Sequence, residues 1–440
     1  MSICWRLVCW RFTGSLYGQA RRVVIVSIDG LKGTTLASLP SRGLKTPNLN
    51  EIVSKGAVSA GLEGVVPTVT YPSHTTLVTG RVPAAHGILG NNMFDPESKT
   101  NGAWYWYAEQ IKTPTLWDAA HAKGLTTAAV SWPVTVGARI DFNFPEYRPF
   151  RSIDDLLSWR AVVTPGLLAE FEKTHGAVTL TNATDEQRAE MAAFLVRTHK
   201  PNLLLVHLLD VDHEEHGSGP DSADAMRALE RNDAGIGVIR AALRETGLEQ
   251  ETVFIVTSDH GFLPVSEAFE PVAVLTSLGL AAPDTAPEKW RVGVFANAAS
   301  FALNLQDPKD KEAEQLATRT FVALQSEGKW GIAKVALRPE LEKAGGYTES
   351  FLAVSMKPGF TVESAKTGPW LRATSWAHGN HGFWPGPVEM DAAFAALGPG
   401  ITARHLPRAH LVDVAPTVAS ILGLDLTPVD GRTLLPREAK

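Results

Sequence analysis

The sequence predicts an α/β protein with a mostly parallel central sheet flanked by helices. Strand-like and helix-like segments alternate from Arg22 onward, which is typical of parallel sheets wrapped by helices. Several of the strand-like segments are unbroken apolar runs rich in β-branched residues, as expected of strands buried on both faces. The chain has 440 residues, of which 44% are hydrophobic and 20% charged, so it can form a large core.

Each segment of the alternation has its own local signals. The helix after the first strand has Pro47 at an early position, and Thr184 is the expected N-cap of a later helix. Gly423 ends the last helix. The expected elements are, in order, strand 23–28, helix 46–55, helix 114–123, strand 126–131, helix 185–198, strand 203–209, helix 222–246, strand 253–256, strand 393–398 and helix 412–422.

The stretch at 263–375 breaks this alternation. It contains short apolar runs at 301–305 and 331–337, a charged helix near 308–327 and many prolines. We expect an inserted α+β subdomain here, while residues 22–262 and 376–437 form the catalytic α/β core. A smaller loop-rich insertion at about 141–183 is expected to cap the site.

The N-terminal residues 1–21 stay unassigned. Arginines interrupt their apolar residues, so they form either a degenerate export signal or a translated upstream extension. No later segment approaches the roughly 18 uninterrupted apolar residues of a membrane-spanning helix, so we expect no membrane span. Both cysteines, Cys4 and Cys9, lie in this extension, so any metal in the folded body has nitrogen and oxygen ligands. The net charge of −6 argues against binding of a nucleic-acid duplex, but not against a nucleotide substrate.

Three aspartates follow closely on predicted strands. They are Asp29, Asp212 and Asp259, and histidines lie beside the last two. Taken alone, each aspartate is more simply a turn former or a helix cap. Because ligands of open α/β sheets bind beyond the carboxyl ends of the strands, their joint occurrence predicts a metal site.

The donor set suits a pair of metal ions that act on a phosphoryl group. Zinc accepts histidine nitrogen and carboxylate oxygen, and two ions about 3.5–4 Å apart can stabilise the entering and leaving oxygens of a displacement. Thr70 supplies a hydroxyl at the start of a helix predicted at 72–79, where it is also the expected N-cap. The six candidate ligands besides this hydroxyl are Asp29, Asp212, His216, Asp259, His260 and His381.

Five motifs, in this order, resemble the nucleotide pyrophosphatase/phosphodiesterase (type I phosphodiesterase) family of the alkaline phosphatase superfamily. The resemblance runs from Val23 to about Arg432 and implies an alkaline phosphatase-like fold. Its motifs are Ile28-Asp29-Gly30, Thr70-Tyr71-Pro72-Ser73-His74 with Asn91 downstream, Asp212-His213-Glu214-Glu215-His216 with Gly219-Pro220, Ser258-Asp259-His260-Gly261, and Asn380-His381-Gly382.

The resemblance implies roles for these residues. Thr70 would attack phosphorus and form a phosphothreonine, which water then hydrolyses. Asn91 would bind a phosphate oxygen together with the backbone N–H of Tyr71, the residue after Thr70. Two zinc ions per chain are implied, one bound by Asp212, His216 and His381 and the other by Asp29, Thr70, Asp259 and His260. Asp210, His213 and His378 remain alternative ligands.

Two residues of the second motif depart from the common family pattern. Ser73 stands where many members have asparagine, and Tyr71 where phenylalanine is common. A tyrosine can still stack on a nucleobase, so Tyr71 is an expected substrate-binding residue. The aromatic run Trp104-Tyr105-Trp106-Tyr107 forms either a packed hairpin, which we favour, or a rim of the substrate site.

The expected function is zinc-dependent hydrolysis of phosphodiester or pyrophosphate bonds, with a nucleotide or another small-molecule phosphodiester as the substrate. Phosphonoacetate hydrolysis and choline-phosphodiester hydrolysis are alternatives within the superfamily, and a non-catalytic, zinc-stabilised phosphate-binding protein is the alternative from another class. The family implies a periplasmic or secreted protein, although the N-terminal signal is poor. The oligomeric state is not predicted.

Overall fold

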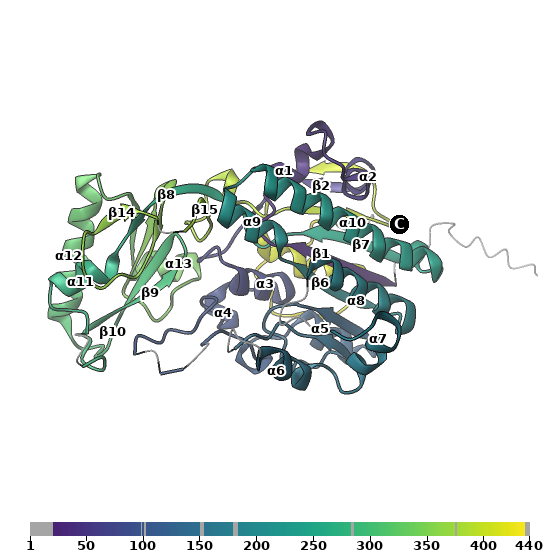
Figure 1. Cartoon of the computed structure of the whole chain (residues 1–440), viewed down its shortest axis with the longest axis horizontal. Helices are drawn as coiled ribbons and strands as arrows, with labels where there is room; N and C mark the ends of the chain where they lie inside the picture. Colours follow the sequence, from purple (N-terminus) through teal and green to yellow (C-terminus); the bar gives the residue numbers. More distant parts are fainter. Residues whose placement is uncertain are drawn as a thin grey trace, which may run out of the picture.

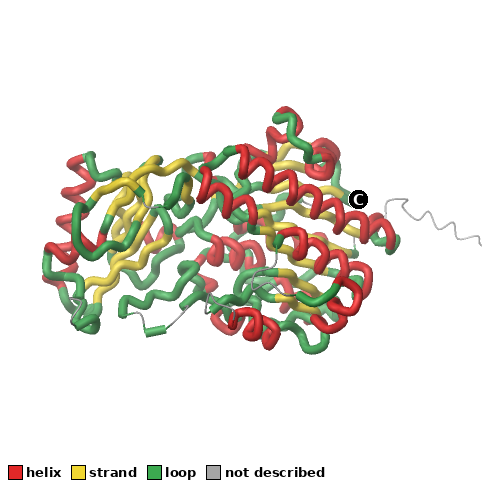
Figure 2. The backbone as a smooth tube through the Cα atoms, viewed as in Figure 1, coloured by secondary structure: helices red, strands yellow, loops and turns green. Residues whose placement is uncertain are grey.

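The structure is a computed structural model that describes residues 21–97, 99–100, 103–149, 154–178, 184–282, 286–374 and 376–435. A large sheet with helices on both faces forms one part of the molecule, and a smaller group of strands and helices lies beside it (Figure 1). The tube view in Figure 2 shows the long helices running across the strands of the large sheet. The predicted fold class, a mostly parallel sheet flanked by helices, is confirmed.

The large sheet is parallel at its centre. The first strand, β1, pairs in parallel with β6 and β7 on its two sides, and β6 pairs in parallel with β4. The strand β16 is antiparallel to both of its neighbours. In spatial order the strands are β17 (Arg404–Leu406), β2 (Ala57–Ser59), β16 (Phe394–Leu397), β7 (Thr252–Thr257), β1 (Arg22–Ile28), β6 (Leu203–Leu208), β4 (Thr127–Val130) and β5 (Phe142–Phe144).

Alternate residues of β1 face two separate hydrophobic clusters. Val24 and Val26 pack on one face of the sheet, whereas Val23 and Ile25 pack on the other. Both faces are therefore buried, which explains why the strands are apolar without alternation. The first face is covered by α1 (Gly33–Ser38), α2 (Pro47–Lys55), α6 (Asp154–Val162), α7 (Leu167–His175), α8 (Asp185–Thr198) and α10 (Ala223–Glu245), and the second by α3 (Thr70–Thr79), α5 (Leu116–Ala122) and α14 (Val414–Leu422).

The predicted elements of the core are confirmed, with boundaries shifted by at most three residues. Thr184 caps α8 as expected, since its hydroxyl accepts a hydrogen bond from the N–H of Gln187. Gly423 ends α14 in the left-handed conformation, with φ of 63°. Two short helices, α4 (Pro83–His86) and α9 (Asp210–Ser218), and the small strand pair β3 (Leu62–Glu63) and β18 (Ala409–His410) complete this part.

The segment between β7 and β16 forms two further sheets around its own hydrophobic cluster. Both apolar runs expected here are strands, and the charged helix is α12. The division into a catalytic core and an inserted subdomain stays a prediction. The elements of the segment are β8 (Leu263–Phe269), α11 (Pro271–Ser277), β9 (Val292–Asn297), β10 (Ser300–Leu305), α12 (Lys311–Glu327), β11 (Ile332–Leu337), α13 (Arg338–Ala344), β12 (Leu352–Met356), β13 (Gly359–Val362), β14 (Leu371–Ala373) and β15 (Gly379–Asn380).

The stretch at 141–183 differs from the expected loop-rich cap. Its first residues form β5, which extends the large sheet beside β4, and it continues with the helices α6 and α7. Leu167 and Phe171 of α7 pack into the core because they lie four residues apart on one helix face. The N-terminal extension lies outside the described residues. No helix among the described residues is long and apolar enough to cross a membrane.

Candidate active site and metal centre

The three aspartates of the predicted metal site lie at the carboxyl ends of three adjacent strands. Asp29 follows β1, which lies between β7 and β6, and Asp259 follows β7. Asp212 lies in the first turn of α9, directly after β6. The parallel register aligns Ile28 with Leu208 and Ser27 with Thr257, so the three strands end at one edge of the sheet. The topology therefore brings together the side chains that the sequence predicts to converge.

Each of these aspartates has a buried oxygen without a hydrogen-bond partner: Asp29 Oδ1, Asp212 Oδ1 and Asp259 Oδ2. The second oxygen of two of them is occupied, because Asp29 Oδ2 lies 3.0 Å from Nε2 of His207 and Asp259 Oδ1 accepts the N–H of Gly30 at 3.2 Å. Buried oxygens without a partner are costly and uncommon in folded proteins. Three of them at one sheet edge indicate a site built for a cation.

Three histidines surround these oxygens in the same orientation. Nδ1 of His216 lies 3.1 Å from the carbonyl of Gly379, Nδ1 of His381 lies 3.2 Å from that of Thr68, and Nδ1 of His260 lies 3.2 Å from that of Gly261. Because a carbonyl can only accept, each Nδ1 carries the hydrogen and each Nε2 keeps its lone pair. Metal-binding histidines show this arrangement, in which a hydrogen bond from one ring nitrogen fixes the tautomer and orients the other toward the ion.

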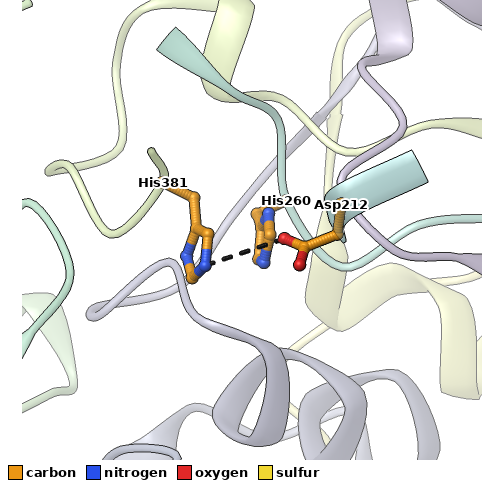
Figure 3. Close-up of side chains that lie close together, drawn as sticks. All are labelled: Asp212, His260 and His381. Atoms are coloured by element: carbon orange, nitrogen blue, oxygen red, sulfur yellow. Dashed lines mark ion pairs between the residues drawn. The ribbon is translucent and has the colours of Figure 1, made fainter. Parts of the chain in front are cut away.

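The ligand atoms form two overlapping groups. Asp29, Asp259 and His260 offer atoms within 4.8 Å of one another, and so do Asp212, His260 and His381. In Figure 3 the rings of His260 and His381 lie beside the Asp212 carboxylate, and the dashed line joins His381 Nε2 to Asp212 Oδ1 at 3.8 Å. His216 Nε2 lies 3.5 Å from the same oxygen. The six predicted ligands thus lie together, with His260 between the two groups.

The alternative ligands lie elsewhere. The side chains of His213 and His378 are exposed, and Asp210 Oδ2 lies 3.4 Å from the guanidinium of Arg231. His381, in contrast, is 5% exposed and belongs to the ligand group. The geometry favours His381 over His378, although the two share the same following glycine.

Burial dominates the electrostatics of this cluster. It raises the pKa of Asp29 well above its usual value, with the neighbouring Asp259 and Asp212 adding to the effect, and it raises the pKa of Asp212 to about 6. Burial also lowers the pKa of His260 to about 3 and that of His381 well below its usual value. In the described residues, every ion-pair partner of the three aspartates is a histidine. A bound divalent cation would supply the positive charge that these carboxylates lack.

Thr70 is the first residue of α3 and not its N-cap. Val69 is the N-cap, and no side chain caps this helix, so the expectation that Thr70 caps it was wrong. The Thr70 hydroxyl is therefore not used as a cap. One turn later, Nδ1 of His74 lies 2.9 Å from the Thr70 carbonyl and 3.7 Å from Asp259 Oδ2. Two residues earlier, the Thr68 carbonyl contacts His381. Thr70 is thus held between a residue of each ligand group.

Asn91 lies at the N-terminus of α3, as predicted. Its Oδ1 accepts the N–H of Tyr71 at 2.8 Å. The resemblance assigns the Asn91 side chain and the Tyr71 N–H to one phosphate oxygen, and in the structure these two groups are bonded to each other. Because Oδ1 is used in this bond, the group that the Asn91 side chain could offer to an anion is its amide Nδ2.

The ring of Tyr71 is only 1% exposed. It packs edge-on against Trp104 and Trp106, at centroid distances of 5.1 and 5.9 Å, and these two indoles stack on each other. Within the aromatic run Trp106 is buried, Trp104 and Tyr105 are partly buried, and Tyr107 is exposed, so its inner residues pack beside the helix that carries Thr70. A substrate-binding role of Tyr71 stays a prediction, and in this arrangement its ring face is covered.

The sequence interpretation missed a set of residues behind the metal ligands. His207 is the penultimate residue of the apolar strand β6 and contacts Asp29, and its Nδ1 lies 3.9 Å from the buried Glu146. His74 packs against His207 at 4.2 Å between ring centroids. A histidine inside a run of leucine and valine was the available signal, because a buried polar ring needs a partner.

The chain matches a family of known proteins over most of its length. The family model described as type I phosphodiesterase / nucleotide pyrophosphatase matches residues 23–384. Over 249 residues the chain is 27% identical to ectonucleotide pyrophosphatase/phosphodiesterase family member 3 of Mus musculus, covering 54% of this chain and 24% of that protein. It is 27% identical over 278 residues to an uncharacterized pyrophosphatase/phosphodiesterase of Schizosaccharomyces pombe, covering 60% of this chain and 50% of that protein. The chain thus spans half or less of the length of these relatives.

Solved structures share the fold. Murine ectonucleotide pyrophosphatase/phosphodiesterase 5, solved as an inactive threonine-to-alanine variant in complex with AMP, matches with a TM-score of 0.67 at 20% identity, covering 93% of this chain and 97% of that chain. The human protein of the same name matches with a TM-score of 0.65 at 21% identity. The likeness confirms the alkaline phosphatase-like fold. Together with the family match over residues 23–384, it leads to one conclusion: the chain belongs to the type I phosphodiesterase/nucleotide pyrophosphatase family.

Proposed function

We propose that this protein is a zinc-dependent hydrolase of phosphodiester or pyrophosphate bonds that acts through a phosphothreonine on Thr70. The observation that carries the proposal is the convergence of three unpartnered carboxylate oxygens and three histidine Nε2 atoms beside the N-terminus of α3. Family membership supports the reaction class, and the donor set supports the metal.

The residues present fit two zinc ions. Their donors are nitrogen and oxygen atoms only, and zinc accepts both kinds. Asp212, His216 and His381 would bind one ion, and Asp29, Asp259 and His260, with the Thr70 hydroxyl, the other. When bound, zinc supplies positive charge that lowers the pKa of the threonine hydroxyl and stabilises negative charge on the phosphoryl oxygens.

The residues of the chain then perform two displacements at phosphorus. In the first, Thr70 Oγ1 forms a bond to phosphorus while the bond to the leaving oxygen breaks. In the second, water attacks the phosphothreonine and Oγ1 leaves. The Asn91 amide would hold a non-bridging oxygen at the N-terminus of α3, where the positive end of the helix dipole favours an anion.

We further propose that the substrates are nucleotides. Murine ectonucleotide pyrophosphatase/phosphodiesterase 5 was solved with AMP, and the mouse and human proteins named above are called ectonucleotide pyrophosphatases. Phosphonoacetate and glycerophosphocholine are the substrates that would instead indicate the alternative reactions of the superfamily. A panel that compares them with dinucleotides and nucleoside triphosphates at equal zinc concentration distinguishes these cases.

The decisive test replaces Thr70. In Thr70→Ala, turnover of p-nitrophenyl thymidine monophosphate should fall at least about 1,000-fold, because removing the nucleophile removes the covalent step. The zinc content should remain at about one ion or more per chain, since the six other ligands are unchanged. Metal analysis of the purified variant and of wild type provides this second measurement.

Two controls accompany this test. Thr75→Ala removes a buried hydroxyl on the same helix, one that donates to the Tyr71 carbonyl, and should retain most of the activity. Near-wild-type turnover in Thr70→Ala would exclude Thr70 as the nucleophile. If the wild-type protein with zinc hydrolysed none of the phosphodiesters in the panel, the result would instead favour a non-catalytic binding protein.

A further inference from the structure

One aromatic side chain beside the metal centre is exposed. Trp376 has 58% of its surface accessible, more than any other large aromatic side chain among the described residues. Its ring lies 5.4 Å from the ring of His216, with the two planes tilted by 47°. His216 itself is partly exposed, with 19% of its side chain accessible. Trp376 therefore stands at the solvent-facing side of the ligand group formed by Asp212, His216 and His381.

The backbone holds Trp376 firmly at this place. The next residue, Ala377, is buried in the hydrophobic cluster of the segment between β7 and β16, and its carbonyl accepts the Thr374 hydroxyl at 2.7 Å. The N–H of His378 donates to the carbonyl of His216 at 2.9 Å, and the carbonyl of His378 accepts from Val265. An indole presents a large planar apolar face and one N–H donor, so at the edge of a site it is suited to stacking on a planar ligand.

The position of Trp376 relative to Thr70 indicates which part of a substrate it can reach. Thr70 is proposed to bind with the group of Asp29, Asp259 and His260, and the leaving oxygen departs on the side opposite to the attacking hydroxyl. That side belongs to the other ligand group, which includes His216. A substituent on the leaving oxygen therefore extends past His216 and toward the indole face.

We propose that Trp376 stacks on the nucleobase of the leaving half of a dinucleotide substrate. This inference rests on the proposed phosphodiesterase function and adds a substrate subsite to it. Every nucleobase has a planar face, so stacking on an indole binds bases with little preference for their identity. The enzyme should therefore prefer substrates whose leaving group carries a base, whichever base it is.

The test uses two substrates that share the nucleotide half bearing the phosphate and differ only in whether the leaving alcohol carries a base. One is thymidylyl-thymidine, and the other is its analogue with an abasic residue on the leaving side, so both release thymidine 5′-monophosphate. In wild type the dinucleotide should have the higher kcat/KM. In Trp376→Ala the ratio of kcat/KM for the dinucleotide to kcat/KM for the abasic analogue should fall about tenfold, mainly because KM for the dinucleotide rises. Trp376→Phe should keep most of the wild-type ratio, since phenylalanine can still stack. Leu337→Ala, which removes an exposed apolar side chain on β11, should leave the ratio unchanged.

A binding measurement gives a readout that does not depend on turnover. Thymidine titrated into the zinc-loaded wild-type protein should quench part of its tryptophan fluorescence. The same titration of Trp376→Phe should not show this quenching, because the stacked indole is absent. An unchanged kcat/KM ratio in Trp376→Ala, with both substrates still hydrolysed, would overturn the stacking role alone. No hydrolysis of either substrate by wild type would overturn the proposed function, and the inference with it.

Discussion

At the scale of single residues, the site depends on hydrogen bonds that leave one atom of each ligand free. His216, His260 and His381 each use Nδ1 on a backbone carbonyl, and Asp29 uses one oxygen on His207. The free atoms all point into the cluster. The orientation of each ligand is therefore set by a group that would not itself touch a metal ion.

His207 offers the clearest test of this arrangement. His207→Phe keeps an aromatic ring at this position but removes the partner of Asp29 Oδ2. The Asp29 carboxylate can then rotate, and its Oδ1 can leave its present position beside His260. We expect the zinc affinity to fall about 10- to 100-fold. Competition with a colorimetric zinc chelator measures this change. His121→Phe, on the exposed surface of α5, is the matched control, and equal affinities of the two variants would contradict the role of His207.

The residue scale is also where the sequence told least about the site. The convergence of the candidate ligands could be predicted, because aspartate and histidine after apolar strands are unusual. His207 and Glu146 could not be assigned, since their function depends on which strands become neighbours. Thr70 was misplaced by one position in its helix, because an N-cap and a first helical residue differ only in backbone angles.

At the scale of elements, the ends of the strands set the ligand positions. The turn after β7 carries Asp259 and His260, and Gly261 follows directly. A Cβ at Gly261 would lie 1.9 Å from the carbonyl oxygen of Glu389, which is backbone and has little freedom to move. The close approach of these two segments requires glycine at this position.

Gly261→Ala should therefore be destabilising. Separating the two segments should lower the free energy of unfolding by about 1–3 kcal/mol and reduce the zinc content, because His260 moves with its neighbour. Gly217→Ala is the control, since nothing lies within 4 Å of its Cβ and alanine favours the helix α9. Urea unfolding of both variants tests the prediction, and equal midpoints would contradict it.

The elements themselves were largely predictable from periodicity and end signals. The stretch at 141–183 was not, because its strand β5 has only three residues and its helices are interrupted by regions without clear periodicity. The edge-on packing of Tyr71 against Trp104 and Trp106 was predicted only in part. A packed arrangement of the aromatic run was expected, but its contact with Tyr71 depends on tertiary structure.

At the scale of the whole molecule, metal binding and stability are linked. Without metal, the folded chain keeps protons on Asp212 and Asp29 up to a higher pH than the unfolded chain, whose aspartates titrate near pH 3.9. These raised pKa values make the metal-free fold lose stability as the pH rises from about 4 through 6. Zinc must displace the same protons, so its binding strengthens over this range.

Zinc should consequently raise the melting temperature more at pH 8 than at pH 5. At saturating zinc we expect an increase of several degrees over the chelator-treated protein at pH 8, and a much smaller one at pH 5. Burial lowers the pKa of His260 to about 3, so this ring is unprotonated at both pH values and does not cause the difference. Scanning calorimetry at the two pH values measures it, and an equal increase would contradict the assignment of Asp212 and Asp29 as ligands.

The carbonyl oxygen of Thr68 couples two parts of the candidate site that are distant in the sequence. It accepts the N–H of Gly382 and contacts Nδ1 of His381, and only two peptide units separate it from Thr70. One backbone atom thus links the turn that leads to Thr70 with the stretch that returns from the segment between β7 and β16. A substitution that shifts this stretch is therefore expected to move His381 and the start of α3 together.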